Sequence, residues 1–121
     1  MIPASVTDVI NDSNKKDLKF NIIVEGANIP MREEIEKELF KKGVLIVPDF
    51  VANVGGVISS YAEYKGYSTQ SMFKLVEEKV TKTTEMVLEK SMRYNRNPRE
   101  VAMEIAKKKI LSTKSEIRNK S

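Results

Sequence analysis

The segment from Phe20 to Val47 constrains the fold most, because it reads as a strand, a helix and a second strand with short connections. Phe20–Val24 and Val44–Val47 are apolar runs rich in β-branched residues, which is typical of strands buried on both faces of a parallel sheet. Between them, apolar residues recur every four positions and predict a helix that opens at Pro30: Met31, Ile35 and Leu39. The simplest arrangement is a parallel pair with a right-handed crossover.

Charged residues and a glycine mark the ends of this helix. Acidic residues at its start, and Lys41 and Lys42 near its end, have the signs that the helix dipole favours. Gly43 follows where helices commonly end with a positive φ angle. The acidic residues occupy alternate positions and cannot converge on a metal ion, so we expect no metal site and interpret all of them as solvated surface: Glu33, Glu34, Glu36 and Glu38.

The chain is predicted to be helical from just after Gly56 almost to its end. One helix covers Val57–Tyr64 and stops near Gly66, and a second helix covers Ser71–Ser91. The second helix carries an apolar stripe that we expect to face the core: Phe73, Val76, Val80 and Val87.

A third helix has a clear start signal at Asn97-Pro98-Arg99-Glu100. Asparagine suits the N-cap, proline the first helical position, and glutamate the third position of a capping box. Val101, Ala102 and Ile105 are expected to face inward from this helix. We expect the end of the chain, Ser112–Ser121, to fray.

The predicted sheet is small. Met1–Ala4 adds at most the end of a third strand, since Pro3 closes it. Two or three parallel strands have apolar faces that need more cover than this chain supplies. The chain therefore either oligomerises or forms part of a larger fold.

The composition limits the chemistry that this chain can perform. Its 121 residues fit one domain, and they include no cysteine and no histidine. Disulfides, thiolate nucleophiles and zinc–sulfur sites are excluded, and the commonest general base and metal ligand is absent. Unaided catalysis is disfavoured. We expect a cytoplasmic protein, because neither a long apolar span nor a signal-peptide pattern is present.

The net charge of +4 is unevenly distributed. Residues 1–90 hold 12 basic and 14 acidic side chains, whereas residues 91–121 hold 9 and 3. A basic patch is what nucleic-acid binding requires. No aromatic side chain is interleaved with the basic ones after Tyr94, so we favour a solvated helix face and expect no nucleic-acid partner.

Two polar motifs follow the two predicted strands. Glu25-Gly26-Ala27-Asn28 comes directly after the first strand, at the edge where ligands bind in open α/β sheets. Gly26 and Ala27 leave room for a flat group, and the Asn28 side chain offers a donor and an acceptor. The alternative is a plain turn with Asn28 near a helix N-cap.

The second motif, Asn53 with Gly55-Gly56 and Ser60, follows the second strand and should reach the same edge. The glycines allow backbone N–H groups to face a ligand at a helix start, and Val57 and Ser60 share one helix face. The alternative is a glycine loop for close packing, with Ser59 and Ser60 hydrogen-bonded back to their own helix. Neither motif has the G-x-G-x-x-G spacing of a dinucleotide fingerprint.

Three segments together resemble a known family: MIPASVTDVI at Met1–Ile10, VEGANIP at Val24–Pro30 and GVLIVPDFVANVGGVISSYAEY at Gly43–Tyr64. They are similar to the later part of the glutamate dehydrogenases, which belong to the Glu/Leu/Phe/Val dehydrogenase family. The resemblance implies an α/β fold in which residues 1–66 form the carboxyl-terminal part of a Rossmann-like NAD(P)-binding domain. Residues 67–121 would be carboxyl-terminal helices that pack back on it.

The resemblance also implies roles for five residues. Asn28 would hydrogen-bond the nicotinamide end of NAD or NADP, and Asn53 would lie beside the nicotinamide and its ribose. Ala4 would lie near the cofactor through its backbone. Val57 would form an apolar wall of the substrate pocket, and Ser60 would bind the side-chain carboxylate of glutamate.

Two departures from the family pattern are modest. Ile29 stands where glycine is frequent, and Val54 stands where alanine is usual. The family's catalytic lysine, acidic partner and G-x-G-x-x-G loop belong to a part of the enzyme that precedes this region.

The resemblance therefore implies oxidative deamination of L-glutamate to 2-oxoglutarate by a larger enzyme. This chain would line that reaction without performing it, with the amino-terminal substrate domain as its partner and a homo-oligomer as the complete enzyme. The alternative is a stand-alone binding or regulatory module that keeps the fold without catalysis.

Overall fold

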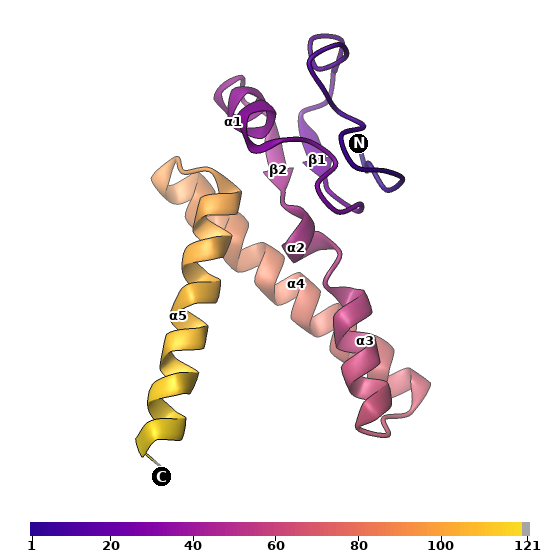
Figure 1. The fold of residues 1–121 in the computed structure, drawn as a ribbon, viewed down its shortest axis with the longest axis vertical. Coiled ribbons are helices and arrows are strands. Elements are labelled where there is room, and N and C mark those ends of the chain that lie inside the picture. The colour runs from indigo at the N-terminus through magenta and orange to yellow at the C-terminus, as the bar shows by residue number, and fades with distance from the viewer. Residues whose placement is uncertain (120–121) are drawn as a thin grey trace.

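The computed structural model describes residues 1–119, and the side chains of residues 1–113. Two short strands and one helix form the upper part of Figure 1, and the remaining helices extend away from them. The elements in chain order are β1 (Ile22–Val24), α1 (Glu33–Lys41), β2 (Leu45–Val47), α2 (Asp49–Ala52), α3 (Gly55–Tyr64), α4 (Thr69–Tyr94) and α5 (Pro98–Asn119).

The two strands are parallel, with Ile23 of β1 opposite Ile46 of β2. On the other edge of β1, the Met1 nitrogen donates to the Ile22 carbonyl at 2.9 Å, and the Val24 N–H donates to the Met1 carbonyl at 2.9 Å. This alternation is the hydrogen-bond pattern of a parallel pair. The α/β fold with two parallel strands is thus confirmed, and the first residues of the chain run beside β1 like a third strand.

The first hydrophobic core lies between the sheet and α1. The predicted helical stripe is buried as expected, because Met31, Ile35 and Leu39 belong to one buried cluster with Ile23 and Ile46 of the strands. The helix begins at Glu33, slightly after the predicted start, and ends before a glycine with a positive φ of 88°. The Gly43 N–H donates to the Phe40 carbonyl at 2.9 Å, so glycine ends this helix as its sequence predicts.

The second core joins the end of β2 to α2, α4 and α5, and α4 and α5 form a wide V in Figure 1. It includes the residues of the third predicted helix that were expected to face inward: Val101, Ala102 and Ile105. The Asn97 Oδ1 accepts from the Arg99 N–H at 2.8 Å, which confirms the N-cap. The short helix α2 was not predicted, because four residues carry no periodicity.

Three expectations about burial and chain ends are wrong. Ile22 of β1 is 52% exposed, because α1 covers only one face of the sheet. Phe73 is 63% exposed, since the first turns of α4 extend beyond the sheet and pack on α3. The helix α5 continues to Asn119, so the chain does not fray from Ser112 to that residue. Lys120 and Ser121 lie outside the described residues.

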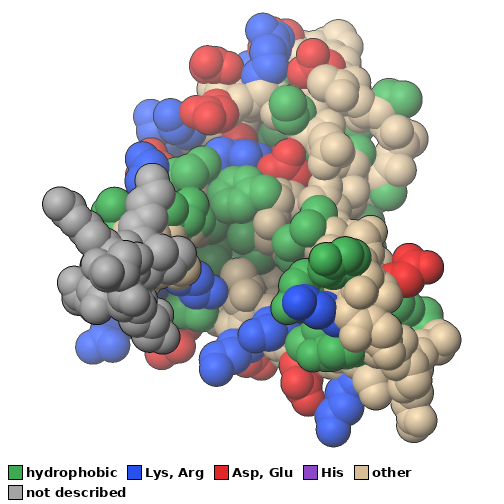
Figure 2. All heavy atoms as spheres, turned by 60° about the horizontal axis from the view of Figure 1, so that its bottom comes forward, with side chains coloured by type: hydrophobic (Ala, Val, Ile, Leu, Met, Phe, Trp, Pro, Cys, Tyr) green, Lys and Arg blue, Asp and Glu red, His purple; other side chains and the backbone are tan. Residues whose placement is uncertain are grey.

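Large apolar side chains remain exposed on several elements. Figure 2 shows hydrophobic side chains around a hollow in the middle of this face, beside the forward ends of α3 and α4. Exposed examples come from the amino-terminal segment, α3 and α5: Ile2, Tyr61 and Leu111. These surfaces agree with the expectation that the chain does not cover its own apolar faces. Over residues 1–119, no helix has the length and apolar character needed to cross a bilayer.

Replacing Gly43 with alanine should lower the free energy of unfolding by about 1 kcal/mol, because an L-residue is strained at positive φ. A Cβ at Gly43 would meet nothing within 4 Å, so the loss reports the backbone alone. Gly56→Ala is the matched control, since its Cβ also meets nothing within 4 Å and its φ is not positive. Urea unfolding measures the free energy of unfolding of both variants. A Gly43→Ala variant as stable as the wild type would contradict the expectation.

Candidate functional site

The carboxyl ends of the two strands bring the two predicted asparagines together. Asn28 follows β1 and Asn53 follows α2, and the Asn53 Nδ2 donates to the Asn28 Oδ1 at 2.6 Å. Asn28 does not cap α1, whose N-cap residue is Arg32. It lies in the turn that leads to this helix, and the expectation that both motifs reach one edge is confirmed.

A cavity of about 790 Å³ opens at this edge. It is lined by the two asparagines, the chain after Ala4, the glycines and the start of α3: Ser5, Val6, Thr7, Gly26, Ala27, Asn28, Asn53, Gly56 and Val57. Three of the five predicted site residues thus line one cavity. Ala4 lies just beside it, because a Cβ placed on Gly26 would come within 3.1 Å of the Ala4 Cβ. Glycine at position 26 allows this close approach.

Ser60 lies one turn beyond Val57 on α3 and does not line the cavity. Its hydroxyl donates to the Gly56 carbonyl at 3.1 Å, and the Ser59 hydroxyl donates to the same carbonyl at 2.9 Å. The alternative interpretation of these serines, hydrogen bonding within their own helix, is confirmed. The Ser60 side chain is exposed, so its hydroxyl oxygen remains accessible to a ligand.

The carboxamide pair keeps hydrogen-bonding capacity for a ligand. Within residues 1–113, no group bonds the Asn28 Nδ2 or the Asn53 Oδ1. One carboxamide donor and one carboxamide acceptor therefore stand side by side at the edge of the cavity. A planar ligand that carries its own amide group matches this pattern.

The turn that presents Asn28 is strained. Ile29 has a φ of 48°, a left-handed conformation that is rare for a β-branched residue. Its N–H donates to the Asp49 Oδ2 at 2.9 Å, and this bond holds the turn. Glycine would adopt this conformation without strain.

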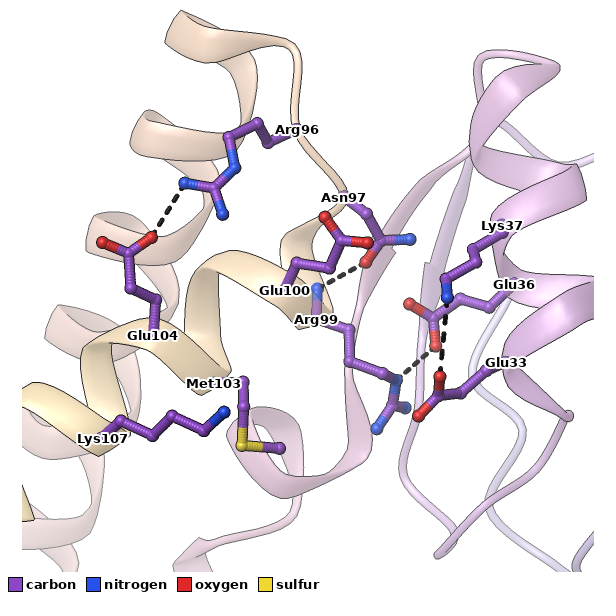
Figure 3. Close-up of a pocket in the computed structure, with 10 residues that line it drawn as sticks. All are labelled: Glu33, Glu36, Lys37, Arg96, Asn97, Arg99, Glu100, Met103, Glu104 and Lys107. Carbon is purple, nitrogen blue, oxygen red and sulfur yellow. Dashed lines mark hydrogen bonds and ion pairs between the residues drawn. The ribbon is translucent and has the colours of Figure 1, made fainter.

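Beneath this edge, one partly buried arginine binds three carboxylates. The Arg99 Nη2 lies 2.7 Å from the Glu25 Oε2, the Nε lies 2.5 Å from the Glu36 Oε2, and the Nη1 lies 3.1 Å from the Asp49 Oδ1. Figure 3 shows Arg99 reaching from α5 to Glu36 on α1. The guanidinium also lies 5.4 Å from the centroid of the Phe50 ring.

Sequence reasoning missed this network. Glu36 was interpreted as solvated surface, which is wrong, because its side chain is 1% exposed and bound by Arg99. The partner lies 63 positions away, so no local pattern identifies it. A usable signal was present in Glu25 and Asp49, which are acidic residues placed directly after apolar strands.

The network carries more negative than positive charge. Both Glu25 Oε1 and Glu36 Oε1 are buried without a hydrogen-bond partner. Burial is the main cause that raises the pKa of Glu25 to about 7, and the charge of Glu36 adds to it. The Asp49 N–H and Arg99 act in the opposite direction. Glu25 is therefore partly protonated near neutral pH, which removes part of the excess charge.

A second cavity, of about 410 Å³, lies between α1 and α5 and is drawn in Figure 3. Its charged walls are largely paired with each other. Arg96 lies 2.8 Å from Glu104, and Lys37 lies 3.7 Å from Glu33. These pairs leave the cavity without a strong preference for one sign of charge, so we assign the functional site to the strand-end edge.

Comparison with known proteins places the chain in a family. Residues 1–117 match the family model of the Glutamate/Leucine/Phenylalanine/Valine dehydrogenases. In structure, the L-tryptophan dehydrogenase from Nostoc punctiforme is similar with a TM-score of 0.84 and 28% identity, over 94% of this chain and 34% of that one. The fold thus resembles part of an amino-acid dehydrogenase.

Two sequence relatives support the same assignment. The glutamate dehydrogenase of Aeropyrum pernix is 38% identical over an alignment 120 residues long. The alignment covers 91% of this chain and 29% of the relative. The NADP-specific glutamate dehydrogenase of Saccharolobus shibatae is 32% identical over an alignment 119 residues long. This alignment covers 92% of this chain and 28% of the relative. The chain belongs to the Glu/Leu/Phe/Val dehydrogenase family of oxidoreductases, and it spans less than a third of these relatives.

Replacing Ile29 with glycine should raise the free energy of unfolding by about 1 kcal/mol, because relief of the left-handed strain exceeds the entropy cost of glycine. Ile22→Gly is the matched control, since its side chain is 52% exposed against 56% for Ile29 and it lies in an extended strand. In the control, the free energy of unfolding should fall by about 1 kcal/mol. Urea unfolding decides, and a destabilised Ile29→Gly would show that its φ carries no strain.

The stability of the chain should fall as pH rises from about 4.5 to about 7. In this window the folded chain keeps the Glu25 proton that the unfolded chain releases, since the folded pKa of about 7 exceeds the ordinary 4.5. The loss is on the order of 3 kcal/mol at most. Glu25→Gln should flatten this dependence, whatever its effect on absolute stability.

Urea unfolding at pH 5 and pH 7.5 measures the Glu25 effect. Glu38→Gln serves as the control, because hydrogen bonds from Lys15 and Lys42 lower the pKa of Glu38 to about 2. Its contribution is complete above about pH 4.5 and is lost only as pH falls toward 2, so it should leave the upper window unchanged. If the free energy of unfolding changes equally with pH in the wild type and in Glu25→Gln, Glu25 does not hold a proton in this window.

Proposed function

We propose that this chain is the carboxyl-terminal part of an NAD(P)-dependent glutamate dehydrogenase, which deaminates L-glutamate oxidatively to 2-oxoglutarate and ammonia. The observation that carries the proposal is the Asn53–Asn28 carboxamide pair, 2.6 Å apart, at the mouth of a strand-end cavity. In this proposal residues 1–66 complete a Rossmann-like dinucleotide-binding domain. Residues 67–121 are helices that pack back on it.

The carboxamide pair suits the nicotinamide end of the cofactor. The free Asn28 Nδ2 would donate to the nicotinamide carbonyl, and the free Asn53 Oδ1 would accept from its amide or from the ribose. Ala4 would approach the cofactor through its backbone from the segment beside Gly26. The nicotinamide, when bound, takes the hydride from the α-carbon of the amino acid. The residues of this chain orient the ring and do not react.

Val57 and Ser60 would face the substrate. Val57 lines the cavity and is 72% exposed, so it can form an apolar wall once a substrate covers it. Ser60 lies one turn further, and its hydroxyl would rotate from the Gly56 carbonyl toward the side-chain carboxylate of glutamate. This contact, together with the names of the two sequence relatives, favours glutamate over a larger apolar amino acid.

The cavity cannot supply a general acid or base. None of its lining residues is charged or titratable at neutral pH. The catalytic groups must therefore come from the rest of a longer enzyme, in line with the small share of the relatives that this chain spans. We propose that the remaining part supplies a lysine-bearing substrate domain and that the complete enzyme is a homo-oligomer.

The same absence of titratable groups favours a second candidate, a binding or regulatory module that uses the fold without catalysis. A nucleic-acid role is disfavoured, because several basic side chains of the last part of the chain are engaged in ion pairs: Arg96, Arg99 and Lys108. The salt dependence of ligand binding would separate a nucleic-acid role from the other two. Affinity for nucleic acid falls steeply as salt rises, because it depends on contacts to phosphates.

The purified chain should bind nicotinamide mononucleotide weakly, with a Kd of about 1 mM or above, because it offers only part of a site. Binding should shift the NMR signals of the Asn28 and Asn53 side-chain amides. Adding L-glutamate and NAD should produce no NADH. Asn28→Ala should abolish the response, whereas Asn21→Ala, at an exposed position away from the cavity, should retain it.

Two outcomes would contradict the proposal. Glutamate-dependent NADH formation by the chain alone would show that it carries its own catalytic groups. A nicotinamide response that survives Asn28→Ala unchanged would place the ligand elsewhere on the molecule.

A further inference from the structure

Asp49 contacts the backbone at both members of the carboxamide pair. Its Oδ2 accepts from the Ile29 N–H at 2.9 Å, one residue after Asn28. Its carbonyl accepts from the Asn53 N–H at 2.8 Å, at the end of α2. The two asparagines are 25 positions apart in the chain, yet Asp49 bonds both Asn53 and the residue that follows Asn28.

The Asp49 carboxylate is itself held on several sides. The Phe50 N–H donates to its Oδ1 at 2.9 Å, and the Arg99 Nη1 lies 3.1 Å from the same oxygen. The Asp49 N–H donates to the Glu25 Oε2 at 2.8 Å, and the Arg99 Nη2 lies 2.7 Å from that oxygen. Arg99, Asp49 and Glu25 thus form a closed ring, so the Asp49 carboxylate cannot rotate without breaking charge-assisted bonds.

The ring contains residues from three parts of the fold. Glu25 follows β1, Asp49 opens α2, and Arg99 lies in the first turn of α5. The capping bond from the Arg99 N–H to the Asn97 Oδ1, 2.8 Å long, fixes where α5 begins. The start of α5 is therefore rigidly joined to the turn that presents Asn28.

We propose that Asp49 and Arg99 are positioning residues for the carboxamide pair, and that they couple the start of α5 to the strand-end site. Arg99 holds the Asp49 carboxylate, the carboxylate holds Ile29 in its left-handed turn, and the turn aims the Asn28 Oδ1 at Asn53. A displacement of α5 would release Arg99 and let the pair separate. That the positioned group is a nicotinamide rests on the proposed function, whereas the positioning itself does not.

The test uses the side-chain amide NMR signals of Asn28 and Asn53 in the 121-residue chain. Asn28→Ala supplies the reference value for an Asn53 amide that has lost its acceptor. Arg99→Lys and Asp49→Asn should move the Asn53 amide signal toward this reference value. A network that only stabilises the fold would lower the urea midpoint and leave the signal in place.

Two controls separate positioning from general stability. Leu39→Ala removes a buried side chain of the first core and should destabilise the chain without moving the Asn53 amide signal. Arg96→Lys alters an exposed ion pair with Glu104 near the start of α5 and should change neither readout.

If the substitutions in the ring prevent folding, Asn97→Ala gives a milder test. It removes only the cap that fixes the start of α5, and it should move the Asn53 signal in the same direction by a smaller amount. Unchanged Asn53 signals in every folded variant of Asp49, Arg99 and Asn97 would overturn the proposal.

Adding nicotinamide mononucleotide to the same samples separates this proposal from the proposed function. If the Arg99 and Asp49 variants move the Asn53 signal but the wild type does not respond to the ligand, the positioning stands and the nicotinamide assignment fails. If the wild type responds and the variants leave the pair unmoved, the nicotinamide assignment stands and the positioning fails.

Discussion

The interaction of Arg99 with Glu25, Glu36 and Asp49 is the constraint on which the rest of this structure depends. One guanidinium from α5 binds carboxylates from the end of β1, from α1 and from the start of α2. A buried charge costs several kcal/mol unless it is paired, so removing Arg99 would leave three uncompensated carboxylates. Because Arg99 contacts one oxygen of each carboxylate, it joins the end of β1, the crossover helix α1 and the start of α2 to the last helix.

The network also explains why an acidic residue follows each of the two apolar strands. Glu25 follows β1 directly, and Asp49 opens α2 just after β2, so both carboxylates lie at the carboxyl ends of the strands. An apolar residue at position 49 could not accept the hydrogen bond from the Ile29 N–H that holds the turn. The pKa of Glu25 is raised mainly because its carboxyl group is buried, and the neighbouring charge of Glu36 adds to the shift.

The candidate site is suited to binding a ligand and not to proton transfer. Its cavity has amide, hydroxyl and apolar walls and lacks a titratable side chain, which suits orientation of a ligand and not proton transfer. The large apolar surfaces in the hollow of Figure 2 and beside β1 agree with a chain built to be covered by further protein. Membership of the amino-acid dehydrogenase family gives both features one explanation.

The sequence by itself determined the features that depend on local order. Four-residue apolar spacing specified α1, β-branched runs specified the two parallel strands, and Gly43 and Asn97 specified a helix end and a helix start. Only the tertiary structure decided that Asn53 bonds Asn28, that Glu36 is buried and that Phe73 is not, because these outcomes depend on partners far away in the chain. The Arg99 bonds to Glu25 and Glu36 span 74 and 63 positions. Contacts at such separations leave no periodicity in the sequence, since they arise only when the cores bring α5 back to the sheet.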